Sequence, residues 1–237
     1  MERIIQLIAG AIAVIFIIAP HEFAHAFAAY KCGDPTAKMR GRMSLNPLKH
    51  LDPMGYALCV FAGFGWAKPV PINPYNFRKY RKGLFLTAIA GVVTNYIIAF
   101  IAYPLYLLIE LLFNQYKVFI VEHIVLNILV QILRLSFLYI FVYGLNVIIF
   151  NLLPLFPLDG FRVVEAFTRE INPVRRFLRN NGQMILLILV VESFLCGILA
   201  SYVPIIQNFN LLRYVQIFGT EILGFPITLM WGLIIPV

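Results

Sequence analysis

Long apolar runs separated by polar segments dominate the hydropathy pattern of the chain. They cover residues 3–30, 84–113, 124–153, 184–203 and 214–237. The first four can each cross a bilayer as a helix, since about 20 apolar residues are enough. The fifth is weaker because Glu221, Gly224 and Pro226 interrupt it. The pattern predicts an all-α, polytopic membrane protein with five transmembrane helices, or four if the last segment lies at the interface.

The longest polar segment, residues 31–82, contains two short apolar runs. Residues 56–61 and 66–72 lie on either side of a turn that contains glycines. Two such runs around a glycine turn are typical of a β-hairpin. Pro69 and Pro71 alternate in the second run, which restricts it to an edge strand. We expect a short β-hairpin on the cytoplasmic side, with an irregular interfacial loop as the alternative.

The composition supports the membrane interpretation. The chain of 237 residues is 61% hydrophobic and 13% charged, whereas soluble domains are about 45–50% apolar and about 25% charged. An ordinary soluble domain is therefore excluded. The three cysteines show no paired spacing, so a disulfide-rich secreted scaffold is excluded as well.

Basic residues are concentrated in two of the predicted loops. Residues 31–82 contain ten Lys and Arg and residues 160–182 contain five Arg, whereas residues 114–123 contain only Lys117. Cytoplasmic loops are enriched in Lys and Arg. We therefore expect a multi-pass protein of a prokaryotic cell membrane, with its N-terminus outside and both basic loops in the cytoplasm. This topology accounts for the net charge of +8, and nucleic acid is not an expected partner.

The first predicted helix carries a candidate metal-binding motif, His21-Glu22-x-x-His25. Histidines at i and i+4 lie on one helix face and can hold one metal ion, while the glutamate between them can reach a metal-bound water. At about 1.5 Å per residue, His25 lies roughly 9 Å and His21 roughly 15 Å below Lys31. Ionisable groups at that depth are costly unless they are paired or bind a metal.

A catalytic zinc usually has three protein ligands, so a third residue is required. His123 lies at the opposite end of its helix and is too distant. Asp159 follows the third apolar run on the correct side, shortly after two prolines. It can also be a helix N-cap, because apolar residues follow it at amphipathic spacing. His50 in the long loop is the alternative third ligand.

With these motifs, the chain resembles the site-2 protease family of intramembrane zinc metalloproteases, in the compact prokaryotic form without PDZ and CBS domains. The matching stretches are His21–His25 and residues 30–55, 63–77 and 151–160. The resemblance implies that His21, His25 and Asp159 bind one zinc ion per chain. It also implies that Glu22 is the general base that activates a zinc-bound water.

The resemblance also implies substrate-binding residues. The family's NxxPxxPxDG motif maps to Asn151, Pro154 and Pro157. Asn95 matches the last residue of the AGPxxN motif of the second core helix, but Val92 replaces the proline of that motif. We therefore expect a different shape at the entrance beside this helix. Asn95 and Asn151 are candidates for stabilising the oxyanion, and helix–helix hydrogen bonding is their alternative role.

The expected organisation is an intramembrane metalloprotease core in residues 1–165, built on three helices. Residues 166–237 would add a cytoplasmic loop and one or two further membrane helices. The expected function is hydrolysis of a peptide bond in membrane-spanning proteins near the cytoplasmic side. The expected partners are these substrates and the lipid bilayer, and the sequence is compatible with a homo-oligomer.

Two other functions fit parts of the sequence. A zinc or cation transporter would use the same His/Asp cluster, but the chain lacks the internal repeat that is typical of transporters. An inactive scaffold that binds membrane helices would not need the intact ligand set and Glu22.

Overall fold

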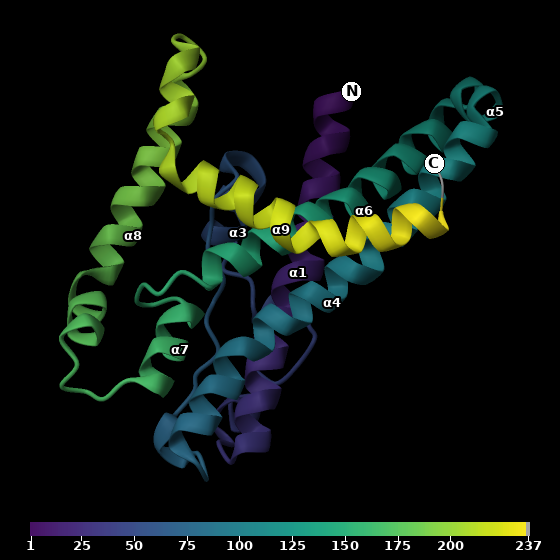
Figure 1. Ribbon diagram of the computed structural model, residues 1–237. Helices are drawn as coiled ribbons and strands as arrows, with labels where there is room; N and C mark the ends of the chain where they lie inside the picture. Colours follow the sequence, from purple (N-terminus) through teal and green to yellow (C-terminus); the bar gives the residue numbers. More distant parts are fainter. Residues whose placement is uncertain (236–237) are drawn as a thin grey trace.

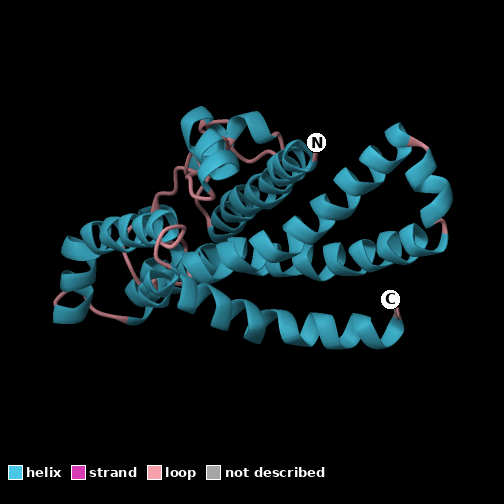
Figure 2. Ribbon diagram, turned by 90° about the horizontal axis from the view of Figure 1, so that it is seen from above, coloured by secondary structure: helices cyan, strands magenta, loops and turns pink. Residues whose placement is uncertain are grey.

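The computed structural model describes residues 1–235 and is built from helices joined by loops, as Figures 1 and 2 show. The elements in chain order are α1 (Glu2–Cys32), α2 (Thr36–Met39), η1 (Pro47–Lys49), α3 (Pro53–Ala62), η2 (Pro74–Asn76), α4 (Tyr80–Gln115), α5 (Lys117–Glu122), α6 (Ile124–Asn151), α7 (Asp159–Phe167), α8 (Pro173–Leu199), η3 (Pro204–Phe209) and α9 (Leu211–Ile234).

Within residues 1–235, five helices are long and apolar enough to cross a membrane: α1, α4, α6, α8 and α9. The prediction of five spans is therefore confirmed by length and composition. The weak fifth run, expected at residues 214–237, corresponds to α9, and its residues 236–237 lie outside the described part of the chain. Which side of the membrane each loop faces stays a prediction.

Helices α1, α4 and α6 pack against one another, and α9 lies across α4 and α6 (Figure 1). The buried core consists of Ala13, Ile17, Ala99, Ala102, Ile140, Phe141, Leu145, Ile148 and Ile227. Its three alanines allow the helix axes to approach closely, as is usual in membranes. Because Ile227 belongs to α9, this core includes a fourth helix in addition to the three that we expected. α8 stands apart from α1 and α4 and contacts α7, η3 and α9.

The predicted β-hairpin is wrong. Residues 53–62 form helix α3, and within residues 1–235 the only strand-like pairing is an isolated antiparallel bridge between Leu51 and Ala67. Local signals explain the helix. The Asp52 side chain accepts a hydrogen bond from the Gly55 N–H, and Pro53 occupies the first turn. Gly63 ends the helix with a left-handed φ of 73°.

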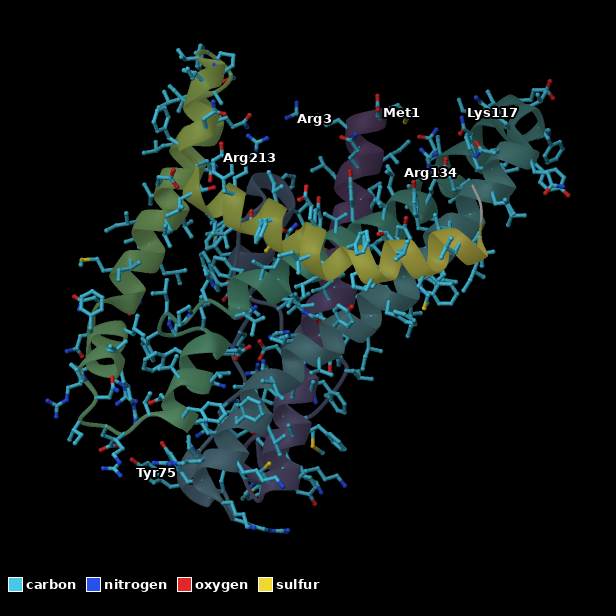
Figure 3. All side chains as sticks on the ribbon, viewed as in Figure 1. Met1, Arg3, Tyr75, Lys117, Arg134 and Arg213 are labelled. Atoms are coloured by element: carbon cyan, nitrogen blue, oxygen red, sulfur yellow. The ribbon has the colours of Figure 1, made fainter. Side chains whose placement is uncertain are left out.

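Helix α3 lies beside the middle of α1. The Tyr56 hydroxyl donates to the Ala11 carbonyl oxygen at 3.0 Å. Ala11 is roughly 30 Å along α1 from Lys31, at about 1.5 Å per residue. The 31–82 segment therefore turns back along the bundle. Figure 3 places Tyr75, from the same segment, near the end of the bundle opposite Met1.

A buried carboxylate joins the end of α1 to the far part of this segment. Asp34 is 0% exposed. It accepts hydrogen bonds from the Thr36 N–H, the Asn73 N–H and the Asn76 amide. Burial alone would raise the pKa of Asp34, but these hydrogen bonds outweigh burial and hold the pKa below its ordinary value.

Replacing Asp34 with Asn should destabilise the protein by about 2 kcal/mol, because an amide N–H₂ would then face backbone donors. The pKa of Asp34 is lower in the folded state than in the unfolded state. Its contribution is therefore fully present above the unfolded pKa of about 3.9 and is lost as the pH falls through the folded value. Thermal unfolding in detergent should show a higher Tm for wild type than for Asp34→Asn. This difference in Tm should be constant near pH 7 and should narrow below about pH 4. A difference that widens in acid would contradict this assignment.

Candidate metal centre

Two buried histidines of α1 converge on one point inside the bundle. His21 and His25 are one helical turn apart and are 6% and 4% exposed. Their Nε2 atoms are 2.9 Å apart. The i, i+4 spacing places both rings on one helix face, and the packing of α1 against α4 and α6 buries that face.

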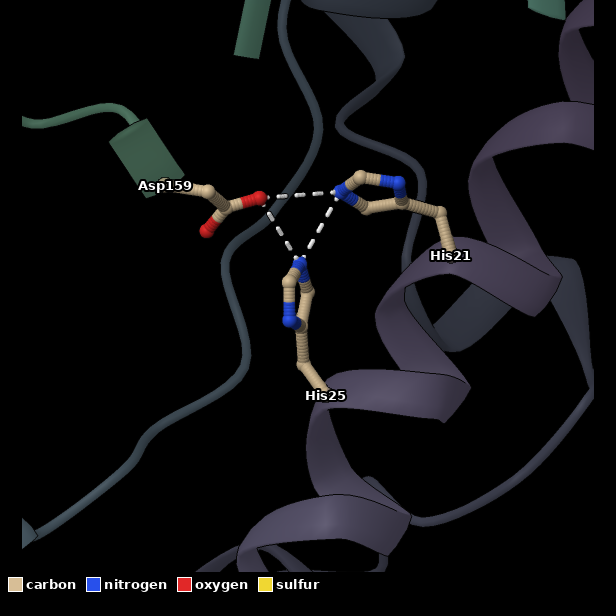
Figure 4. A group of neighbouring side chains, drawn as sticks. All are labelled: His21, His25 and Asp159. Carbon is tan, nitrogen blue, oxygen red and sulfur yellow. Dashed lines mark hydrogen bonds and ion pairs between the residues drawn. The ribbon is translucent and has the colours of Figure 1, made fainter. Parts of the chain in front are cut away.

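Asp159 completes this group from a different part of the chain (Figure 4). It is the first residue of α7, and Leu158, not Asp159, occupies the N-cap position. Asp159 Oδ2 lies 3.3 Å from His21 Nε2 and 3.0 Å from His25 Nε2.

The geometry of the three donor atoms suits a tetrahedral metal ion. With bonds of about 2.0–2.1 Å, neighbouring ligands of a tetrahedral zinc are about 3.3 Å apart. The three separations are 2.9, 3.0 and 3.3 Å. Asp159 Oδ2 is buried and accepts no hydrogen bond within residues 1–235, and a cation between it and the two Nε2 atoms would satisfy it. Two imidazoles and one carboxylate, with a fourth position open, form a donor set typical of catalytic zinc.

The outer nitrogens of both rings are held by α4. His25 Nδ1 lies 2.7 Å from the Thr87 carbonyl oxygen, which can only accept, so Nδ1 carries the proton and Nε2 is free to bind a metal. His21 Nδ1 lies 3.1 Å from Nδ2 of the fully buried Asn95. The Asn95 oxygen has no hydrogen-bond partner in the described chain. The amide turned by 180° satisfies this oxygen, which then accepts from Nδ1–H and leaves His21 Nε2 free to bind a metal. Such outer contacts orient metal-binding histidines.

Glu22 lies at the same site but is not part of the three-residue cluster. Its Oε2 accepts a hydrogen bond from the Val70 N–H at 3.0 Å. Glu22 lines a cavity of about 520 Å³ together with His21, His25 and Asp159. A carboxylate thus faces the same space as the candidate metal ligands.

The four predicted substrate-binding residues occupy different environments in the structure. Asn151 and Pro157 line the cavity, whereas Pro154 is exposed in the turn between α6 and α7. The Asn151 amide donates to the Val147 carbonyl oxygen within α6. Asn95 is fully buried behind His21. Substrate contact by these residues stays a prediction.

The other two histidines lie outside the metal-ligand group. His50, the alternative third ligand, is fully buried, and its Nε2 lies 2.6 Å from the Ser44 carbonyl oxygen. His123 is exposed between α5 and α6, and its Nδ1 lies 2.8 Å from the Phe119 carbonyl oxygen. The structure therefore brings Asp159, and not His50, to the two histidines of α1.

Comparison with known proteins agrees with this arrangement. The model of peptidase family M50, the site-2 protease family, matches residues 9–195. The chain belongs to this family. It is 44% identical over 156 residues to a Bacillus subtilis (strain 168) protein named "Putative zinc metalloprotease YwhC". That alignment covers 65% of this chain and 66% of the relative's own length. No solved structure matches the chain.

A glycine of α4 allows the M50 histidines to pack as they do. A Cβ atom on Gly91 would lie 2.5 Å from His21 Cε1 and 2.6 Å from His25 Nε2. Neither distance is sterically possible, and both rings are buried. Gly91 therefore provides the space in which the two imidazoles meet. In the sequence, Gly91 corresponds to the glycine of the AGPxxN motif that ends at Asn95, and its contact with the two rings appears only in the structure.

Replacing Gly91 with Ala should displace at least one imidazole and lower the zinc content to below about half of the wild-type value, because zinc affinity depends on ligand position. The substitution should not harm α4 itself, since Ala favours a helix over Gly by about 1 kcal/mol. The matched control is Gly197→Ala in α8, where an added Cβ meets nothing within 4 Å. Metal analysis of both purified variants tests this. Full zinc in Gly91→Ala would show that the rings can move without loss.

Proposed function

We propose that this M50 protein is an intramembrane zinc endopeptidase. The observation that carries the proposal is the convergence of His21, His25 and Asp159 beside Glu22 on the wall of one cavity, next to membrane-spanning helices. A zinc ion held there would polarise the scissile carbonyl and lower the pKa of water toward about 7.

In this proposal Glu22 is the general base. Its carboxylate takes a proton from the attacking water and gives it to the leaving nitrogen of the substrate. The Val70 N–H holds Oε2 at 3.0 Å, so Oε1 is the oxygen available for that proton. The role is therefore divided between the two oxygens: one fixes the orientation and the other transfers the proton.

The two asparagines have different proposed roles. Asn95 orients His21, because it is fully buried and faces His21 Nδ1. Asn151 lies on the cavity wall with its N–H₂ donated to the Val147 carbonyl oxygen. In that orientation its free oxygen can accept a hydrogen bond from an extended substrate backbone. To stabilise an oxyanion instead, the Asn151 amide would have to rotate.

The proposed substrates are membrane-spanning proteins that are cut near the cytoplasmic side. The ligands lie inside the helical bundle, and the basic loops at 31–82 and 160–182 mark the cytoplasmic end by the charge rule. A helical substrate hides its carbonyl groups in hydrogen bonds. It must therefore unwind at the site before water can attack.

Reconstitution into liposomes tests the proposal. The probe is a mixture of tagged single-span proteins, incubated with the purified chain, with a zinc chelator, and with zinc restored after chelation. We expect cleavage that the chelator abolishes and zinc restores. Radioactive zinc uptake into the same vesicles tests the transporter alternative. Zinc uptake without cleavage of any substrate would overturn the protease proposal.

A further inference from the structure

Residues 66–70 of the long loop lie along the cavity wall, and the last of them, Val70, contacts Glu22. Trp66, Ala67, Pro69 and Val70 all line the cavity. Val70 is flanked by Pro69 and Pro71, which have no N–H. The only backbone donor of this tripeptide therefore belongs to Val70, and it is donated to Glu22 Oε2 at 3.0 Å.

Contacts at Ala67 and Lys68, three and two residues before Val70, fix this segment. The Lys68 N–H donates to the His50 carbonyl oxygen at 2.8 Å. The Lys68 carbonyl oxygen accepts from Arg42 Nη2 at 2.6 Å. Leu51 and Ala67 form the isolated antiparallel bridge. The stretch that presents the Val70 N–H is thus held mainly by residues 50–51 on the opposite side.

His50 is the buried residue of this pairing. It is 0% exposed, and its Nε2 lies 2.6 Å from the Ser44 carbonyl oxygen. A carbonyl oxygen only accepts, so Nε2 carries the proton and donates it. The side chain of His50 therefore binds one part of the loop while its backbone carbonyl binds Lys68. A fully buried side chain with a directed hydrogen bond allows its own backbone little movement.

We propose that His50 is a positioning residue for Glu22. It holds the Lys68–Val70 segment in register, so that the Val70 N–H fixes one carboxylate oxygen of Glu22. This inference rests on the proposed function, in which Glu22 is the general base. His50 is not part of the candidate metal-ligand group, so in this proposal it affects proton transfer and not metal binding.

Single substitutions separate positioning from metal binding. In His50→Leu we expect kcat to fall about 10- to 100-fold, because a misplaced catalytic group costs that much. The KM value should stay within about 2-fold and zinc content should match wild type. His50→Gln restores an N–H donor near the Nε2 position and should recover most of the lost kcat. His123→Leu, at an exposed histidine between α5 and α6, is the matched control and should leave kcat unchanged.

A double-mutant cycle tests the route through Val70. Val70→Pro removes the N–H, whereas Val70→Ala keeps it and controls for the lost side chain. If His50 acts through this N–H, His50→Leu should change kcat by less than about 2-fold in the Val70→Pro background. If the two substitutions act independently, their fold-changes in kcat multiply in the double variant. That result would overturn the proposal.

A second link keeps the test valid if His50→Leu does not fold. Lys68 is exposed, so Lys68→Pro removes the N–H donated to His50 without removing a packed side chain. Lys68→Ala is the control for the lost side chain. We expect Lys68→Pro to keep its zinc and to lose kcat as His50→Leu does. Suppose that wild type cleaves, that Glu22→Gln does not, and that Lys68→Pro has the kcat of wild type. That result would refute the positioning role of His50 but leave the proposed function standing. Absence of cleavage by wild type would instead refute the proposed function.

Discussion

Glu22→Gln should lower cleavage by at least about 100-fold and leave the zinc content near the wild-type value. Gln keeps the size of the side chain and an oxygen that can accept from the Val70 N–H. It removes the basic carboxylate, and loss of a general base costs about 10²- to 10⁴-fold. Zinc analysis and cleavage assays on one preparation provide the measurement.

The matched control for this variant is Glu122→Gln, which makes the same change at an exposed position at the end of α5. It should behave as wild type in both assays. Zinc lost together with activity in Glu22→Gln would make Glu22 a ligand or a structural residue. Full cleavage by Glu22→Gln would remove it from the mechanism.

Asp159→Ala should lose most of the bound zinc and all measurable cleavage. The two remaining imidazoles, whose Nε2 atoms lie 2.9 Å apart, supply only two of the four ligands of a tetrahedral zinc. His21→Ala and His25→Ala should behave in the same way. His50→Ala should retain zinc, since His50 is bonded to Ser44 and lies outside the ligand group. If His50→Ala empties the site and Asp159→Ala does not, the ligand assignment is wrong.

The sequence carried enough information for the spans and for most of the candidate metal-ligand group. Hydropathy alone predicted five crossings, because the bilayer imposes a minimum length on each helix. The His21 and His25 pair follows from helical periodicity, which is local. Asp159 lies 134 residues beyond His25, so spacing left His50 open as an alternative. The family resemblance favoured Asp159, and the structure places it against both rings.

The residues that support the site were harder to predict. The α3 segment was misread because its apolar run is too short for periodicity to separate a strand from a helix. Its start and stop signals, Asp52-Pro53 and Gly63, were a better guide. The roles of Gly91 and His50 depend on contacts between distant segments. No local pattern reports such contacts.

The central claim is that His21, His25 and Asp159 together hold one zinc ion. X-ray absorption at the zinc edge of the purified protein tests this most directly. We predict about one zinc per chain, a first shell of nitrogen and oxygen only at about 2.0–2.1 Å, and outer scattering from two imidazoles. Cys59 also lines the cavity and offers a competing type of ligand, a thiolate sulfur. A sulfur neighbour at about 2.3 Å, or an unchanged spectrum in Asp159→Ala, would contradict the account.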